Sequence, residues 1–204
     1  MSNFDFNEAE PQRAGSGSLI PDNTIALVVV KIRPGGTGPG GYLKGSSTGA
    51  EMLDLEFTID GGDFDRRKLW SNYVTSGVTE GHEKAANITR SRLRAMLESA
   101  RGVLPTDTSP DAIAARRANG WGDFDGLVFC AKIGIEQGAL KDKRAGPQSE
   151  RWDDKNVIKA VITPDEPHYI APTPQAKAAA AAQGAANTNA PAATQAAAKP
   201  SWAS

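Results

Sequence analysis

Basic and aromatic residues occur together at three places in this sequence, and their chemistry suits single-stranded nucleic acid. Lysine and arginine neutralise phosphates, while flat rings stack on bases, a contact worth about 1–3 kcal/mol per base. The first place follows the most apolar run, the second is DGGDFDRRKLW, and the third is GALKDKRAGPQSERWDD. The candidate nucleic-acid-binding residues are Lys31, Arg33, Tyr42 and Lys44 in the first, Arg66, Arg67, Lys68 and Trp70 in the second, and Lys141, Lys143, Arg144, Arg151 and Trp152 in the third.

Acidic residues lie beside several of these basic groups and support a different interpretation. Asp60, Asp63 and Asp65 accompany the second group, and Asp54 and Glu56 belong to the polar face of the segment before it. Their carboxylates would cancel part of the positive charge and repel phosphate. We therefore predict that DGGDFDRRKLW forms the wall of a groove and that the third group supplies the main contact.

The tryptophans of these groups are open to two interpretations each. Trp70 alternates with Leu69 and Tyr73, so one of the two faces belongs to the core, and tryptophan is more often a core residue than a stacking surface. Trp152 and Arg144 lie in a polar stretch. They could contact nucleic acid or belong to an ordinary solvated loop.

Residues for catalysis or metal binding are sparse. His82 and His168 are the only histidines, and the single cysteine, Cys130, falls in an apolar segment, where we expect a small buried side chain. The glycine-rich PGGTGPGG lacks the Gly-Lys-Ser/Thr ending of a phosphate-binding P-loop. We expect no enzymatic activity, no metal site and no cofactor.

Composition limits the remaining classes. Hydrophobic residues make up 39% of the 204 residues, below the usual ~45–50%, so part of the chain has no core to build. The net charge of −1 gives no global basic field. One cysteine fits a reducing compartment. The longest apolar run, IALVVV, is far shorter than the ~20 residues of a membrane span, and the first residues do not resemble a secretory signal. We expect a soluble protein of the cytoplasm, or of the host cytoplasm if a phage encodes it.

The chain divides into three zones. Residues 1–23 form an acidic arm with four acids and one arginine, ending in the flexible AGSGS. Residues 24–170 form the folded body. Residues 171–204 are rich in alanine and proline, and we expect a mostly disordered tail with Trp202 near its end.

Within the body, hydrophobic periodicity predicts five strands and two helices. The strands are expected at residues 24–33, 51–59, 67–75, 127–137 and 155–163. Asp60-Gly61-Gly62-Asp63 is predicted to be a hairpin turn, and residues 34–49 a mobile loop. An apolar stripe predicts a helix over 79–102 with Gly102 as its stop, and a shorter helix runs from Ser109 to Gly120.

This order is that of an OB-fold, a five-stranded Greek-key barrel (β-β-β-α-β-β). In such a barrel the face of the second and third strands, flanked by the loops after strands one and four, binds oligonucleotides or oligosaccharides. We expect a mainly β, OB-fold-like domain in which the three basic-aromatic groups converge on one surface.

Three stretches also carry patterns of apolar residues and glycines, and the last of them carries a Lys-Asn pair. They are FDFNEAE with LIPDNT, GAEMLDLEFTIDGGDFDRRKLW, and GLVFCAKIGIEQG followed by DDKNVIKAVIT. Residues 1–169 thereby resemble a phage and prophage family known as a domain of unknown function. Its genes often lie among replication and recombination genes, and its members are often described as single-stranded DNA-binding proteins. The chain departs from bacterial proteins of that class in its ending, PSWAS, which has no acidic tip to recruit partners, and in its few aromatics.

The sequence therefore carries two main hypotheses. The first is a protein that binds single-stranded DNA without sequence specificity in phage replication or recombination, with replication or recombination proteins as further partners. The second is a protein-interaction module of a phage recombination or assembly complex that does not touch nucleic acid. A third hypothesis is that the arm and the tail assemble the protein into homo-oligomers. No membrane partner is expected.

Overall fold

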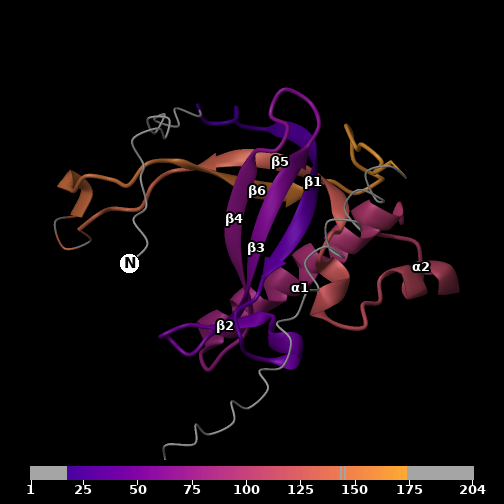
Figure 1. Ribbon diagram of the computed structural model, residues 1–204, viewed down its shortest axis with the longest axis horizontal. Helices are drawn as coiled ribbons and strands as arrows, with labels where there is room; N and C mark the ends of the chain where they lie inside the picture. Colours follow the sequence, from indigo (N-terminus) through magenta and orange to yellow (C-terminus); the bar gives the residue numbers. More distant parts are fainter. Residues whose placement is uncertain (1–17, 143, 145, 174–204) are drawn as a thin grey trace, which may run out of the picture.

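A computed structural model describes residues 18–142, 144 and 146–173 of the protein (Figure 1). The strands are β1 (Thr24–Arg33), β2 (Leu43–Gly45), β3 (Glu51–Asp60), β4 (Lys68–Ser76), β5 (Val128–Glu136) and β6 (Lys155–Val161). The helices are α1 (Glu80–Arg101) and α2 (Pro110–Ala115), with short 3-10 turns η1 (Pro39–Gly41), η2 (Trp121–Phe124) and η3 (Gly146–Gln148). The protein is mainly β, as the periodicity predicts.

The strands form one antiparallel sheet. β1 lies between β3 and β5, β6 pairs with the far edge of β5, and β4 pairs with the far edge of β3. β4 and β6 approach each other, but the described chain has no hydrogen-bonded ladder between them, so the sheet is open there. α1 packs across β4, β5 and β6 on one side (Figure 1).

The prediction of five strands is wrong by one short strand. β2, which pairs with the first residues of β3, lies inside the segment expected to be a mobile loop. Of its three residues only Leu43 is buried, at 5% exposure. Alternation cannot be recognised over so few residues, and the surrounding glycines indicate a loop.

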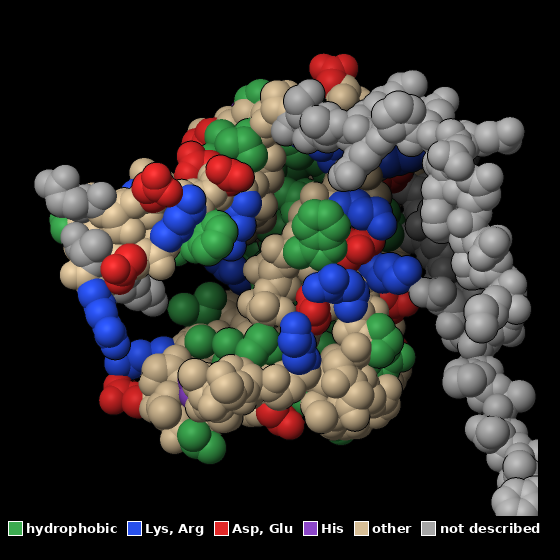
Figure 2. Space-filling view, turned by 60° about the vertical axis from the view of Figure 1, so that its left-hand side comes forward, with side chains coloured by type: hydrophobic (Ala, Val, Ile, Leu, Met, Phe, Trp, Pro, Cys, Tyr) green, Lys and Arg blue, Asp and Glu red, His purple; other side chains and the backbone are tan. Residues whose placement is uncertain are grey.

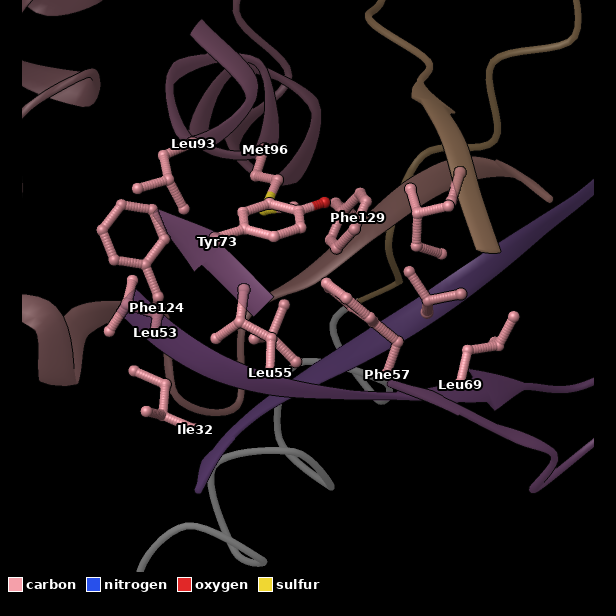
Figure 3. Packing of buried hydrophobic residues seen from close by; sticks show 14 of the residues in the cluster. Ile32, Leu53, Leu55, Phe57, Leu69, Tyr73, Leu93, Met96, Phe124 and Phe129 are labelled. Atoms are coloured by element: carbon pink, nitrogen blue, oxygen red, sulfur yellow. The ribbon is translucent and has the colours of Figure 1, made fainter. Parts of the chain in front are cut away.

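The hydrophobic core lies between the inner face of the sheet and α1. Leu53, Leu55, Phe57 and Ile59 alternate along β3 and are all buried, as predicted. The Phe57 ring lies 6.0 Å from that of Tyr73 and 6.1 Å from that of Phe129 (Figure 3). Leu93, Met96 and Leu97 of α1 close this layer. One apolar face of the sheet is thus fully used for folding, and the opposite face is left for other roles.

The ends of α1 follow from local chemistry. The Thr79 side chain accepts a hydrogen bond from the His82 backbone N–H at 3.2 Å, and Gly102 has φ 70° and donates its N–H to the Glu98 carbonyl. Glycine adopts this left-handed conformation without the steric cost that other residues pay. The predicted helix and its stop at Gly102 are confirmed.

The second helix begins as predicted but ends early. Ser109 caps it and Pro110 is its first residue, yet it ends at Ala115 rather than near Gly120. The following Arg116 is held against α1, because its Nε donates to the buried Glu98 carboxylate at 2.6 Å. The chain then turns toward η2, which packs beside β1. A contact between distant segments, rather than local propensity, sets this boundary.

Residues 18–23, which composition assigns to the arm, are attached to the sheet. Asn156 of β6 accepts from the Ile20 backbone N–H at 2.8 Å and donates to the Ile20 carbonyl at 2.9 Å. The Ile20 side chain is 1% exposed. Asp22 accepts from the Ile135 N–H and lies 3.3 Å from the Lys159 ammonium, and both interactions lower the pKa of its carboxyl group.

Candidate nucleic-acid interface

The face of the sheet that points away from the core brings together predicted site residues from four strands. We call this surface the outer sheet face and define it by seven residues: Lys31, Arg33, Lys44, Asp54, Glu56, Lys68 and Trp70. Side chains alternate along a strand, so the buried Ile32, Leu55 and Leu69 require their neighbours to point the other way. The register then aligns Lys31 and Trp70 with Glu56, and Arg33 with Asp54.

Asp54 organises one end of the outer sheet face. Arg33 contacts both carboxylate oxygens of Asp54 through Nη2 at 2.7 Å, and its Nε adds a bond at 3.1 Å. The Lys44 ammonium lies 3.4 Å from the same carboxylate. The Asp54 side chain is only 10% exposed, whereas those of Arg33 and Lys44 are about half exposed. The carboxylate is therefore covered by two cations that remain open to solvent.

Glu56 is also covered by neighbouring side chains, in this case one cation and one indole. Its carboxylate accepts from the Lys68 ammonium at 2.7 Å and from the Trp70 indole N–H at 3.2 Å. Burial raises the pKa of Glu56, but the hydrogen bonds from Lys68 and Trp70 outweigh it and hold the pKa below its usual range. Among the seven residues that define the outer sheet face, four basic side chains and two acidic ones give a formal charge of +2.

Trp70 lies on the exposed side of its strand. It is 50% exposed, whereas Leu69 and Tyr73 are each 3% exposed and take the core positions. Of the two interpretations that the sequence left open, the exposed position is the one found. The bond to Glu56 fixes the orientation of the indole while leaving half of its surface free. Figure 2 shows blue and red side chains intermingled around exposed green ones on one side of the molecule.

The other basic residues of the hairpin make local contacts. The connection between β3 and β4 is longer than the predicted four-residue turn, because the Arg66 N–H bonds to the Ile59 carbonyl and the Ile59 N–H to the Arg67 carbonyl. The side chain of Arg66 is 90% exposed and lies 3.6 Å from Asp65. Arg67 donates to the Ser18 carbonyl, and its guanidinium lies 6.0 Å from the Phe64 ring. Arg67 thus binds the first described residues of the chain.

The third basic-aromatic group lies on a separate projection. Residues 137–154, which we call the β5–β6 extension, continue the β5–β6 hairpin beyond the sheet (Figure 1). Leu140 and Arg151 form an antiparallel bridge, and Arg151 donates to the Gly138 carbonyl at 3.0 Å. Lys141 lies 3.0 Å from Glu150 and 5.5 Å from the ring of Trp152, which is 63% exposed.

The β5–β6 extension carries no net charge. Lys141, Lys143, Arg144 and Arg151 are balanced by Asp142, Glu150, Asp153 and Asp154. Arg144 is exposed, and Lys143 lies outside the described residues. Among the residues that the structure describes, no hydrogen bond or ion pair joins this extension to the outer sheet face. The first group without Tyr42 and half of the second therefore meet on one surface, and the third stays apart.

Tyr42 lies apart from the outer sheet face, in a pocket between η1 and η2. It is half buried, packs against the core and lines the pocket together with Trp121 and Phe124. Trp121 did not emerge as a candidate from the sequence. The available signal was its place in GWGDFDG, a tryptophan with a glycine on each side.

Other classes of site find little support in the described residues. Within the described ranges, no group of three or more His, Cys, Asp and Glu side chains could hold a metal ion. Cys130 is fully buried, as predicted, and this burial raises the pKa of its thiol. None of the described helices is long and apolar enough to cross a membrane.

The comparisons with known proteins add no relative to this picture. No family model matches the chain, and no curated protein matches its sequence. The arrangement of the chain's own residues is therefore the basis for assigning a function.

Proposed function

We propose that the protein binds single-stranded DNA, without strong sequence preference, across the outer sheet face. The observation that carries this proposal is Trp70, which is half exposed on the same face of the sheet as the cations of Lys31, Arg33, Lys44 and Lys68. A flat ring among cations is what binding of single strands requires, since the ring stacks on a base and the cations contact phosphates. The main contact is then made by the sheet rather than by the neutral β5–β6 extension.

The topology supports the same surface. We propose that β1, β3, β4, β5 and β6 correspond to the five strands of an OB-fold-like barrel, with β4 and β6 as the two edges that approach each other. β3 and β4 are then the second and third strands, and their exposed face is the one on which OB-folds bind oligonucleotides. Glu56, Lys68 and Trp70 lie on that face.

We further propose that the protein is a binding protein rather than an enzyme and that it coats exposed strands during phage replication or recombination in the cytoplasm. The resemblance of residues 1–169 to the phage and prophage family supports this role. Replication or recombination proteins would be its further partners.

The direct test is fluorescence anisotropy of a labelled oligo-dT strand against the full chain, over a series of salt concentrations and with a duplex competitor. We expect binding that the duplex competitor does not displace. The affinity should fall as the salt concentration rises, because neutralising phosphates releases counterions. Contacts from all four cations would give a slope of log K against log salt of about −3. Absence of binding at low salt would contradict the proposal.

Neutralising a carboxylate of the outer sheet face should strengthen DNA binding. Asp54→Asn keeps the shape of the side chain, removes one negative charge and leaves Arg33 and Lys44 free to contact phosphate. We expect about threefold tighter binding at low salt and a steeper salt dependence. Asp153→Asn in the β5–β6 extension is the matched control and should leave the affinity unchanged. Equal affinities for Asp54→Asn and the unmodified chain would show that DNA does not approach this face.

The second candidate function, a protein-interaction module, is favoured by the β5–β6 extension. It projects from the body, is electrically neutral and exposes Trp152 beside Lys141. Tryptophan is enriched at the energetic centres of protein interfaces. This candidate becomes the better one if oligo-dT does not bind at low salt. If oligo-dT does bind, the extension remains available for a protein partner of the DNA-bound form.

A further inference from the structure

A second concave surface lies at one end of the sheet, outside the outer sheet face. It is a pocket of about 480 Å³ between η1 and η2. That volume falls within the ~300–1,000 Å³ of small-molecule sites. Its lining comes from two segments far apart in sequence: Pro39, Gly40 and Tyr42 on one side, and Ala118, Asn119, Gly120, Trp121, Gly122 and Phe124 on the other.

The aromatic walls of this pocket are held in place. Phe124 is 4% exposed and belongs to the core, so it forms a fixed floor (Figure 3). Tyr42 and Trp121 pack against the same core. Two glycines allow the Tyr42 ring to lie close to the backbone, because a Cβ at Gly40 would lie 2.7 Å from its edge and one at Gly122 would lie 2.8 Å from its hydroxyl. The pocket is therefore formed before any ligand arrives.

Polar atoms in the lining are left without protein partners. In the described part of the chain, neither the Tyr42 hydroxyl nor the Trp121 indole N–H makes a hydrogen bond. The Asn119 amide nitrogen lies 3.4 Å from Asp123, which leaves the amide oxygen of Asn119 free to accept. Aromatic faces combined with a few free donors and acceptors are the features by which proteins recognise an unstacked base.

Both lining segments of the pocket are connected, through a few residues of chain or one hydrogen bond, to strands that carry the outer sheet face. Tyr42 is followed by β2, whose Lys44 contacts Asp54 on that face. On the other side, Asp125 follows η2 and accepts from the Ile32 N–H at 2.7 Å, one residue before Arg33. Arg117 precedes the lining residue Ala118, is exposed and forms no ion pair within the described chain. A cation thus lies within two residues of each lining segment, where it could contact the phosphates next to an inserted base.

We propose that this pocket takes one nucleobase of the strand that lies on the outer sheet face. The inference rests on the proposed function and deepens it. The outer sheet face would stack on bases and neutralise phosphates without regard to sequence, and the pocket would add a site that holds a single unstacked base. The base would lie against Tyr42 and Trp121, and its polar edge would meet the free groups of Tyr42, Trp121 and Asn119.

A scan with abasic sites tests the inference. The unmodified chain is titrated with oligo-dT strands that each lack one base at a different position. We expect the affinity to fall about 10-fold when the missing base is the one that enters the pocket, because a lost contact between a base and an aromatic ring has an effect of this size. Ala118→Leu, which occupies part of the pocket, should bind the intact strand about as weakly and show no further loss at that position. Ala114→Leu, an exposed position on α2 outside the lining, is the matched control and should behave as the unmodified chain.

The outcomes separate this inference from the proposed function. If no chain binds intact oligo-dT at low salt, the proposed function fails and the pocket inference fails with it. If the unmodified chain binds intact strands, tolerates a missing base at every position and Ala118→Leu binds equally well, the proposed function stands and the pocket inference is overturned. Tyr42→Phe, which removes only the hydroxyl, should weaken base discrimination while preserving binding.

Discussion

Replacing Trp70 with alanine is expected to weaken binding of oligo-dT by about 10-fold or more, the largest single effect on affinity that this protein should show. Stacking of a base on an aromatic ring is worth about 1–3 kcal/mol, and 1.4 kcal/mol corresponds to a factor of ten. Trp70 is the tryptophan of the outer sheet face, and half of its surface is free for such a contact. Anisotropy titration at constant low salt measures the change.

Two further variants make this result specific. Trp70→Phe keeps a flat ring and should retain most of the affinity. Trp152→Ala removes a tryptophan of similar exposure from the β5–β6 extension and should change the affinity less than twofold. Folding should be little affected by Trp70→Ala, because Lys68 continues to pair with Glu56 at 2.7 Å. A larger loss from Trp152→Ala than from Trp70→Ala would move the binding surface to the extension.

Replacing Glu98 with alanine should have the largest effect on stability among charged residues, about 3–5 kcal/mol. The side chain of Glu98 is 4% exposed and accepts from Arg116 at 2.6 Å and from Arg94 at 2.9 Å. Arg116 also donates to the Asp107 and Leu104 carbonyls, each at 2.7 Å. Loss of the carboxylate would leave the Arg116 guanidinium, whose side chain is only 14% exposed, without its counter-charge.

Urea denaturation measures this effect, with a lower midpoint and an unchanged slope as the expected result. Arg94→Ala is the matched control, because its side chain is 55% exposed and its contact with the same carboxylate should contribute no more than about 1 kcal/mol. The double variant Glu98→Ala with Arg116→Ala should lose less free energy of unfolding than the sum of the losses of the two single variants, because it leaves no buried charge without its partner. Additive losses would mean that the two residues act independently.

The pattern of strands and helices could be predicted from the sequence because it depends on local periodicity. Leu53, Leu55, Phe57 and Ile59 alternate over enough residues to define a strand and its buried face. Thr79 and Gly102 mark the ends of α1 through hydrogen bonds to residues within one turn. β2 was not predicted because three residues are too few to show a period. The end of α2 was not predicted because Arg116 is held by a hydrogen bond to Glu98, 18 residues earlier in the chain.

The candidate site could not be predicted in full, because it is formed by contacts between residues far apart in the sequence. The sequence by itself determined which residues are basic, aromatic or acidic, and that Asp54 and Glu56 lie on a polar face. Only the tertiary structure decided that Arg33 and Lys44 cover Asp54, because strand register sets those pairs across 21 and 10 residues of chain. It also decided that Trp70 faces outward, since Leu69 and Tyr73 fill the core, and that the extension stays apart. Residue types are local properties, whereas the surface on which they meet is set by pairing and packing between distant segments.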